Sequence, residues 1–234
     1  MGVEGLGKAA EEDPKFWLTS FISEKVVTDQ DSGDSVKRVF DVSASLLGIL
    51  FLAPLLVMVA ILIYLSSGRP IFFAHRRVGR GGREFHCLKF RTMVNNSETV
   101  LAEHLSKDVA ARREWETTHK LKDDPRVTAL GRALRKSSVD ELPQLLNVLR
   151  GDMSLVGPRP VVEKEAIHYG AHFSEYIKVR PGLTGPWQVS GRNDLSYVAR
   201  VNLDVGYVQN RNFVRDIVII AKTVPAVLRS RGCY

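Results

Sequence analysis

One apolar stretch dominates the hydrophobic pattern of this chain. Residues 42–65 contain no charged side chain. As a straight helix this stretch would reach about 36 Å, more than the roughly 30 Å thickness of a bilayer core. The run is too long and too uniformly apolar for the buried helix of a soluble protein. It therefore predicts a helix that meets a membrane.

Two further features bear on how that helix would enter the membrane. Pro54 lies at its middle, where a proline removes one helix hydrogen bond and favours a kink. Lys37 and Arg38 precede the stretch, and a group of arginines beginning at Arg69 follows it. Positive charge favours the cytoplasmic side, so one spanning helix cannot satisfy both flanks. A helix that breaks at Pro54 and returns to the same face can, and from the pattern alone both geometries stay open.

The rest of the chain shows shorter patterns. Residues 71–78 and 84–90 are rich in apolar and aromatic side chains and are separated by a glycine-rich turn, which predicts a β-hairpin. That glycine run lacks the lysine and hydroxyl spacing of a P-loop. Residues 97–120 are expected to form polar, exposed helix.

Two later segments have helical periodicity. Leucines recur with the spacing of one helix face at 142, 145, 146 and 149. Residues 213–224 give an apolar face bordered by basic residues, which fits either a helix at a membrane surface or one packed on the core. We therefore predict a mostly α fold with a small β element, attached to one membrane face by a re-entrant helix-break-helix and interfacial amphipathic helices.

Composition narrows the class of protein. The chain has 234 residues with a formal net charge of +7, which suits one domain with appendages. Residues 1–35 hold eight acidic and three basic side chains and are predicted to be a polar, partly disordered leader without the pattern of a secretory signal. Cys87 and Cys233 have no metal-type spacing. Basic residues are not interleaved with aromatic ones, so nucleic acid is not an expected partner.

The adjacent carboxylates Asp140 and Glu141 are the candidate reactive groups. Pro143 suits the first turn of a helix, which would place Asp140 near the N-cap and Glu141 in the first turn. A purely structural interpretation, in which Asp140 caps the helix and Glu141 favours its dipole, accounts for an isolated pair. A cap at Ser138, with Glu141 closing a capping box, is the alternative.

The basic surroundings of the pair favour phosphate chemistry instead. Free N–H groups at a helix start bind phosphate, and a carboxylate there can attack phosphorus to form an acyl phosphate. Because a pyrophosphate repels a carboxylate, Mg²⁺ held by carboxylate and phosphate oxygens is expected. The candidates for neutralising the remaining charge are Lys89, Arg91, Arg135, Arg159, Arg180 and Arg192.

Several segments together resemble a known family. They are Lys89-Phe90-Arg91-Thr92-Met93 and residues 138–145, 151–160, 180–185 and 187–192, in that order. Through them, residues 36–234 closely resemble the bacterial sugar transferase family, the monotopic polyprenyl-phosphate phosphoglycosyl transferases. The chain is most similar to the minimal catalytic form, and among its members to the hexose-1-phosphate transferases that start exopolysaccharide repeat units.

The resemblance implies a reaction. Sugar-1-phosphate, here galactose or glucose phosphate, passes from a UDP-sugar to undecaprenyl phosphate, and UMP is released. Asp140 would be the nucleophile of a ping-pong mechanism and would contact Mg²⁺, with Glu141 supporting the metal and phosphate. Direct attack by the lipid in a ternary complex is the alternative mechanism, and a membrane-anchored adaptor is the non-enzymatic alternative. The expected substrate-binding residues are Lys89, Arg91, Arg135, Pro158, Arg159, Pro160, Arg192 and, most weakly, Asp204.

The resemblance also implies a place in the cell. Residues 36–68 would form the re-entrant helix with its break at Pro54, and residues 69–234 a catalytic domain on the cytoplasmic face of the bacterial inner membrane. Members often have Ser-Pro at the break, whereas this chain has Ala53-Pro54 and would rely on proline alone. Partners would be the UDP-sugar, undecaprenyl phosphate, membrane lipid and downstream glycosyltransferases.

Overall fold

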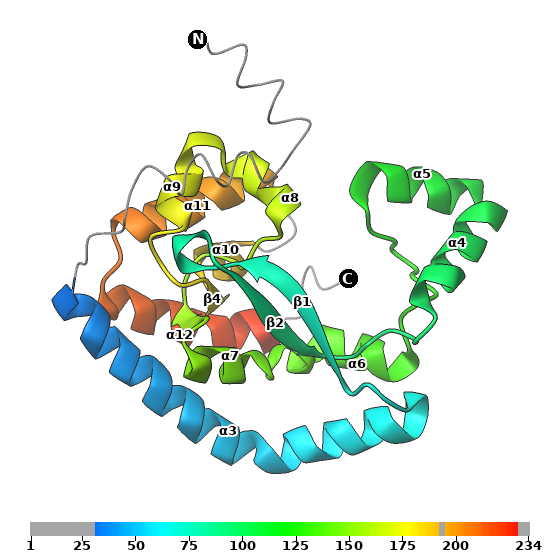
Figure 1. Ribbon diagram of the computed structural model, residues 1–234, viewed down its shortest axis with the longest axis horizontal. Helices are drawn as coiled ribbons and strands as arrows, with labels where there is room; N and C mark the ends of the chain where they lie inside the picture. The colour runs from blue at the N-terminus through cyan, green and yellow to red at the C-terminus, as the bar shows by residue number, and fades with distance from the viewer. Residues whose placement is uncertain (1–30, 192–194, 229–234) are drawn as a thin grey trace, which may run out of the picture.

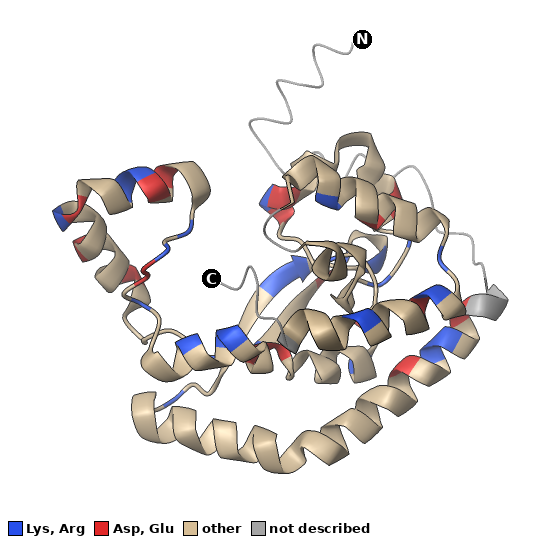
Figure 2. Cartoon of the chain, turned by 180° about the vertical axis from the view of Figure 1, so that it is seen from behind, with Lys and Arg blue, Asp and Glu red and all other residues tan. Residues whose placement is uncertain are grey.

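The apolar stretch forms the central part of one long helix, α3 (Asp31–Ser67), in a computed structural model of the protein. The structure describes residues 31–191 and 195–228, with side chains from residue 34 onward, so nearly all of the predicted leader lies outside the described residues. Helix α3 contains Pro54, changes direction near its middle, and runs along one side of the molecule (Figure 1). Its central stretch carries no charged residue, whereas charges are spread over the other elements (Figure 2).

Both halves of α3 pack on the same domain. Near the N-terminal end, Arg38 donates hydrogen bonds of 2.6 and 3.0 Å to the carbonyls of Val148 and Leu149 at the end of α7 (Gln144–Arg150). In the C-terminal half, the buried residues Val59 and Ile63 belong to a core cluster with Phe90 and Leu134. The outer face of the helix stays open, with large apolar side chains such as Leu50, Phe51 and Leu65 exposed.

The predicted hairpin is confirmed. Strand β1 (Phe72–Val78) pairs antiparallel with β2 (Glu84–Phe90), and the short 3₁₀ turn η1 (Arg80–Gly82) joins them. Gly81 and Gly82 have φ of 67° and 73°, which glycine adopts without strain, so the glycine run serves the turn. The hairpin packs against α7 through β2.

The polar segment after the hairpin is helical, as predicted, but it is two helices. Helix α4 (Ser97–Lys107) ends at Asp108, whose side chain accepts hydrogen bonds from the Ala110 and Ala111 amides and thereby starts α5 (Val109–Thr118). Together they form an arm that projects away from the other elements (Figure 1). The chain then returns through α6 (Ala129–Ser137), the 3₁₀ turn η2 (Val139–Glu141) and α7.

The C-terminal half contains a second, parallel sheet that the sequence patterns did not predict. Strand β3 (Ser154–Val156) pairs with β4 (Gly182–Thr184). The segment between the two strands contains α8 (Glu163–Ala166), η3 (Ile167–His172) and α9 (Phe173–Tyr176). After β4 come α10 (Pro186–Ser190), α11 (Tyr197–Gln209) and α12 (Phe213–Leu228). The mostly α prediction with a small β component is confirmed for the described residues.

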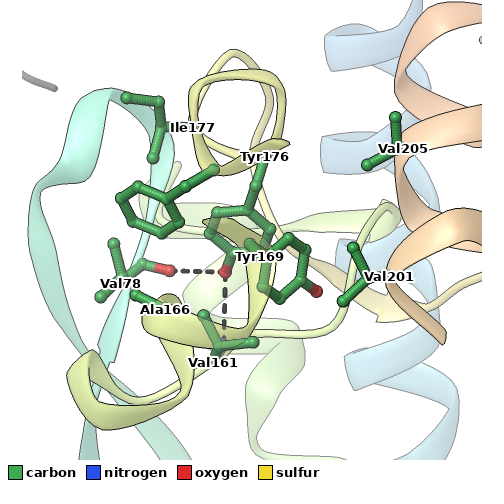
Figure 3. Close-up of a cluster of buried hydrophobic side chains, with 9 residues drawn as sticks. Val78, Val161, Ala166, Tyr169, Tyr176, Ile177, Val201 and Val205 are labelled. Atoms are coloured by element: carbon green, nitrogen blue, oxygen red, sulfur yellow. Dashed lines mark hydrogen bonds between the residues drawn. The ribbon is translucent and has the colours of Figure 1, made fainter. Parts of the chain in front are cut away.

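A buried cluster joins the hairpin to this half. The hydroxyl of Tyr176 donates a 2.8 Å hydrogen bond to the Val78 carbonyl and accepts one of 3.2 Å from the Val161 amide (Figure 3). Val201 and Val205 of α11 close the cluster from the other side. The end of β1 is therefore held against the segment that follows β3, and this contact fixes the position of residues 158–160 relative to the hairpin.

Helix α12 has the basic amphipathic character expected of residues 213–224, and it lies beside the start of α3. The Phe213 ring meets the Phe40 ring edge-on, with 5.2 Å between centroids. Val214, Ile217 and Val224 are exposed, while Ile219 is buried in the core. The helix thus packs on the core with one face and leaves an apolar face beside that of α3.

Candidate active site

Asp140 lies in η2, in the short passage between α6 and α7. The predicted N-cap position is wrong. Ser138 adopts a left-handed conformation (φ 58°), its amide closes α6 on the Leu134 and Arg135 carbonyls, and the chain resumes helical geometry before Pro143 is reached. The Ser138 side chain makes no capping hydrogen bond, so the alternative capping box is also wrong. Asp140 and Glu141 are consequently held by a tight turn rather than at the start of a long helix.

The Asp140 carboxyl is 7% exposed, and its burial raises its pKa to about 6. The positive charge of Lys89 opposes this rise in pKa, the negative charge of Glu141 adds to it, and Arg135 opposes it. Burial disfavours the charged form of a carboxyl, whereas nearby cations favour it. The Asp140 carboxyl therefore keeps its proton up to slightly acidic pH and is fully ionised only at higher pH.

Glu141 differs from its neighbour. Its Oε1 lies 2.6 Å from Nζ of Lys89, and its side chain is 40% exposed. Lys89 comes from β2, so this ion pair connects the hairpin to η2. The ammonium group of Lys89 also faces Asp140 closely enough to affect the pKa of that carboxyl. The structure thus brings Lys89 together with Asp140 and Glu141.

Arg135 and Arg91 take different roles in the structure. Nε of Arg135 donates a 3.0 Å hydrogen bond to Oγ1 of Thr92, and the charge of this arginine reaches Asp140. Arg91 instead directs its guanidinium at the end of α3, where NH2 donates to the Ser67 and Gly68 carbonyls at 2.7 and 2.8 Å. Arg91 therefore holds the C-terminal end of α3, and the described contacts give it no role at the Asp140–Glu141 pair (the dyad).

The segment Pro158-Arg159-Pro160 follows β3 directly. The Arg159 guanidinium carbon lies 5.2 Å from the centroid of the Trp187 ring, and that of Arg200 lies 5.0 Å from the same centroid. Trp187 is buried, so it forms a rigid aromatic surface that positions both guanidinium groups by cation–π contact. Pro158 is buried and Pro160 half-buried, and together they restrict the backbone on either side of Arg159.

Asp204 of α11 is buried next to the segment of residues 158–160. It is 2% exposed, and its Oδ2 accepts a 2.9 Å hydrogen bond from the Tyr169 hydroxyl. Burial raises the pKa of Asp204 to about 7, while the Tyr169 hydroxyl and the Arg159 backbone amide and charge oppose the shift. Its surroundings place Asp204 behind Arg159, as a buried support and not as a group beside Asp140.

Arg77 connects strand β1 to the segment of residues 158–160. It donates to the Pro160 carbonyl (3.1 Å) and pairs with Glu165 (3.4 Å). Burial raises the pKa of the Cys87 thiol on β2, and the nearby positive charges of Lys89, Arg77 and Arg159 oppose that rise. Lysine and arginine charges from β1, β2 and residues 158–160 therefore surround one region beside the dyad.

Sequence reasoning missed several of these residues. Arg77 belongs to none of the segments that carry the resemblance, although the alternation of β1 would have placed it on the same face as Lys89. Trp187 begins one of those segments, but no role could be assigned to it from the sequence. Lys120 and Arg200 also belong to the basic region, since burial together with the charges of Arg159 and Arg200 lowers the pKa of Lys120. No pattern in one sequence could have identified them, because the contacts arise from separate elements.

Arg192 and Arg180 are the two remaining candidates from the sequence. Arg192 lies outside the described residues. Nε of Arg180 donates a 2.9 Å hydrogen bond to the Gly151 carbonyl, and this arginine lines a polar cavity under the start of α3 together with Asp34 and Arg38. Asp140 and Glu141 do not line that cavity, so Arg180 contributes to the scaffold.

The donor set at the dyad suits Mg²⁺ only in combination with a substrate. Across residues 31–191 and 195–228 no group of three potential metal ligands comes together. Two neighbouring carboxylates are present, and Mg²⁺ in proteins is commonly held by one or two carboxylates together with substrate phosphates and water. The residues fit a cation that arrives with a phosphate better than a permanently bound ion.

Comparison with known proteins shows the family to which the chain belongs. Residues 32–230 match the description "Bacterial sugar transferase". The chain is 52% identical over 214 residues to the exopolysaccharide production protein ExoY of Sinorhizobium fredii, covering 92% of this chain and 95% of the relative. It is 50% identical over 199 residues to an undecaprenyl-phosphate galactose phosphotransferase of Salmonella typhimurium, covering 85% and 42%.

A third relative differs in the sugar that its name gives. The UDP-glucose:undecaprenyl-phosphate glucose-1-phosphate transferase of Caulobacter vibrioides is 42% identical over 209 residues, covering 86% of this chain and 73% of the relative. The family match spans almost the whole described chain and includes the dyad, the hairpin and residues 158–160. The protein is therefore an enzyme of the bacterial sugar transferase family.

Proposed function

We propose that this enzyme transfers hexose-1-phosphate, with galactose or glucose as the sugar, from a UDP-hexose to undecaprenyl phosphate and releases UMP. This would be the first membrane step in assembling an exopolysaccharide repeat unit, and downstream glycosyltransferases would extend the product. The names of the relatives support the reaction class. The observation that carries the proposal is a buried carboxylate, Asp140, beside a lysine-paired Glu141 and a basic region that suits a diphosphate.

The first half-reaction uses Asp140 as nucleophile. A carboxylate oxygen attacks the β-phosphorus of the UDP-sugar, an O–P bond forms, and the bond from that phosphorus to the bridging oxygen breaks. UMP leaves with the bonding electrons, and the sugar phosphate stays on Asp140 as an acyl phosphate. Arg159, held against Trp187, and Lys89 lie where they would neutralise charge on the diphosphate.

The second half-reaction regenerates the carboxylate. A phosphate oxygen of undecaprenyl phosphate attacks the same phosphorus, and the bond to the Asp140 oxygen breaks. Asp140 and Glu141 would hold Mg²⁺, which when bound would screen the phosphate charges from the two carboxylates. Lys89 keeps Glu141 oriented through their 2.6 Å contact, and Arg135 holds positive charge behind Asp140.

A re-entrant α3 accounts for how the lipid phosphate meets a water-soluble nucleotide sugar. Lys37, before the apolar stretch, pairs with Asp216 of α12, and Ile63, near the end of that stretch, packs in the cluster of Phe90 and Leu134. A straight spanning helix would carry one of these ends to the opposite side of the bilayer, away from the domain it contacts here. Both contacts support a helix that bends at Pro54 and leaves the domain on the cytoplasmic face of the inner membrane.

The decisive experiment measures the two half-reactions separately. The protein in lipid nanodiscs is incubated with a panel of UDP-sugars without acceptor, and the phosphosugar adduct on the protein and released UMP are quantified by mass spectrometry. Undecaprenyl phosphate is then added. We expect a stoichiometric adduct with one UDP-hexose, which the lipid discharges. Asp140→Asn should lose adduct and turnover by roughly a thousandfold or more.

The alternatives give other results. UMP release that requires the lipid, without any adduct, would favour direct attack in a ternary complex. No UMP release with any UDP-sugar would favour a membrane adaptor. Glu103→Gln on the exposed arm serves as the charge-matched control and should behave like the wild type, because the carboxylate of Glu103 is exposed and pairs with Lys107 on the same helix. An Asp140→Asn protein that still forms the adduct would exclude Asp140 as nucleophile.

A further inference from the structure

One face of the hairpin changes character along its length. In an antiparallel pair, directly opposed residues and their second neighbours share a face. Phe73 opposes Lys89, His75 opposes Cys87, and Phe73 stacks on His75 with 5.8 Å between ring centroids. Arg77 follows on the same face, so β1 presents an aromatic ring at one end and a guanidinium group at the other.

The two ends of this hairpin face lie next to different parts of the protein. Arg77 donates to the Pro160 carbonyl beside Arg159, on the side where the basic region suits the nucleotide diphosphate. Phe73 lies at the other end, a few residues after α3 ends at Ser67. Lys89, which opposes Phe73, contacts Glu141 beside Asp140. The dyad is therefore adjacent to this face, with its apolar end directed toward the membrane helix.

Phe73 is 52% exposed although it sits among charged groups. Apart from Phe72, the nearest exposed large apolar residues that precede it in sequence are Tyr64 and Leu65, near the C-terminal end of α3. Its ring lies on the same hairpin face as Lys89, next to the Lys89–Glu141 pair and at the end of β1 that follows α3. In undecaprenyl phosphate the phosphate is attached directly to the first isoprene unit. A lipid whose phosphate reaches Asp140 therefore has to place that isoprene unit next to this part of the hairpin.

We propose that Phe73 is an acceptor-binding residue, on whose ring the isoprene units nearest the phosphate of undecaprenyl phosphate pack while that phosphate attacks at Asp140. This inference rests on the proposed function and adds the residue that receives the lipid. Because the contact is made only in the second half-reaction, removing the ring should weaken the acceptor and leave the UDP-sugar untouched.

Phe72 provides a matched control. It precedes Phe73 in β1, is similarly exposed at 48%, and has the same side chain. Its ring faces the opposite side of the hairpin and stacks on Phe90, 5.3 Å away between centroids. If exposed rings here served only to hold the protein in the membrane, Phe72 and Phe73 would be equivalent.

The test compares Phe73→Ala, Phe73→Leu and Phe72→Ala in nanodiscs of one lipid composition. The KM for undecaprenyl phosphate and the rate of adduct formation without lipid are measured for each. We expect Phe73→Ala to raise the acceptor KM about tenfold, as the loss of a partly buried ring implies, with adduct formation within twofold of the wild type. Phe73→Leu should recover most of the loss, and Phe72→Ala should match the wild type.

The outcomes separate the inference from the function on which it rests. If the wild type releases no UMP from any UDP-sugar even with undecaprenyl phosphate present, the proposed function fails and the inference falls with it. If the wild type is active and Phe73→Ala leaves the acceptor KM unchanged, only the inference is overturned. Equal losses in Phe72→Ala and Phe73→Ala, with reduced flotation on liposomes, would assign both rings to membrane anchoring and would also overturn it.

Discussion

Nζ of Lys89 lies 2.6 Å from Oε1 of Glu141, and this contact makes the two adjacent carboxylates of the site chemically different. Glu141 is ion-paired and partly open to solvent, whereas Asp140 is buried and its pKa is raised to about 6. Two groups with opposite environments suit different roles, one as the nucleophile and the other as a charged support. The sequence places the carboxylates side by side, but the assignment depends on a lysine from a strand fifty residues earlier.

The first prediction concerns pH. Asp140 attacks as a carboxylate, and its raised pKa means that the proton leaves only as the pH rises through about 6. Adduct formation at low UDP-sugar concentration should therefore be low at pH 5, rise through pH 6 and level off above pH 7. Measuring the step without lipid is essential, because a phosphate monoester titrates in the same range. A flat profile between pH 5 and 7 would contradict the assignment.

The second prediction follows from the charges that act on Asp140. Lys89 lowers the pKa of this carboxyl and Glu141 raises it. Lys89→Met should therefore move the acid limb of the adduct-formation profile to higher pH, and Glu141→Gln should move it to lower pH. Both variants should also reduce the maximal rate, since each removes a group beside the phosphate. The limb's position is independent of that loss. Lys107→Met, on the exposed arm, is the control and should leave the profile in place.

The third prediction tests the scaffold under Arg159. A Cβ added to Gly182 would lie 2.1 Å from the Gly157 nitrogen, which the parallel pairing of β3 and β4 does not allow. Gly182→Ala should push the strands apart, shift Pro158-Arg159-Pro160, and destabilise the protein by about 1–3 kcal/mol. Activity should fall although Gly182 has no side chain to contact a substrate.

Gly206, within α11, is the matched control for that change. A Cβ there meets nothing within 4 Å, so Gly206→Ala should keep activity and raise stability by about 0.5–1 kcal/mol through its helix preference. Thermal unfolding in nanodiscs together with UMP release would measure both variants. Equal behaviour of the two alanine variants would show that the close approach of the strands is dispensable.

The sequence patterns predicted the elements with strong periodicity and missed the contacts between distant segments. The hairpin, the apolar helix and the polar arm were predictable because each has a local signal. The pairing of Ser154 with Gly182 was not, because strands of three residues have no period to detect. Arg91 shows the limit most clearly. A motif suggested a substrate ligand, whereas its contacts with the carbonyls of Ser67 and Gly68 depend on where α3 ends.

The turn at Asp140 shows a second limit. Pro143 is compatible with the first turn of a helix, and the cap was predicted from that preference. The left-handed Ser138 instead ends α6 and begins the next turn, so two helical segments follow one another almost without a loop. A left-handed residue other than glycine carries little sequence signal, because residues with a Cβ adopt this conformation uncommonly and no residue type marks it.

The fourth prediction concerns the attachment of α3. Nζ of Lys37 lies 2.6 Å from Oδ2 of Asp216, which is 2% exposed, and 3.7 Å from Asp41. Lys37→Met leaves two buried carboxylates without their cation and should destabilise the protein by about 3–5 kcal/mol. The double variant Lys37→Met with Asp216→Asn should recover part of the loss, because asparagine still accepts from Tyr207. An additive double variant in thermal unfolding would show that the pair is not coupled.

The fifth prediction tests the break in α3. Both ends of the helix contact one domain, so cysteines introduced at Val36 and at Glu103 should be labelled from the same side of sealed membrane vesicles by an impermeant maleimide. The background should lack Cys87 and Cys233, and a permeant maleimide reports total accessible thiol.

Pro54→Leu restores the helix hydrogen bond and favours a straight helix long enough to cross the bilayer core. We expect part of that population to label Val36→Cys from the opposite side, with loss of turnover in proportion. Opposite-side labelling of the two positions in the protein with Pro54 intact would refute the re-entrant arrangement, because the contacts of Lys37 with Asp216 and of Ile63 with Phe90 could not then form in one molecule.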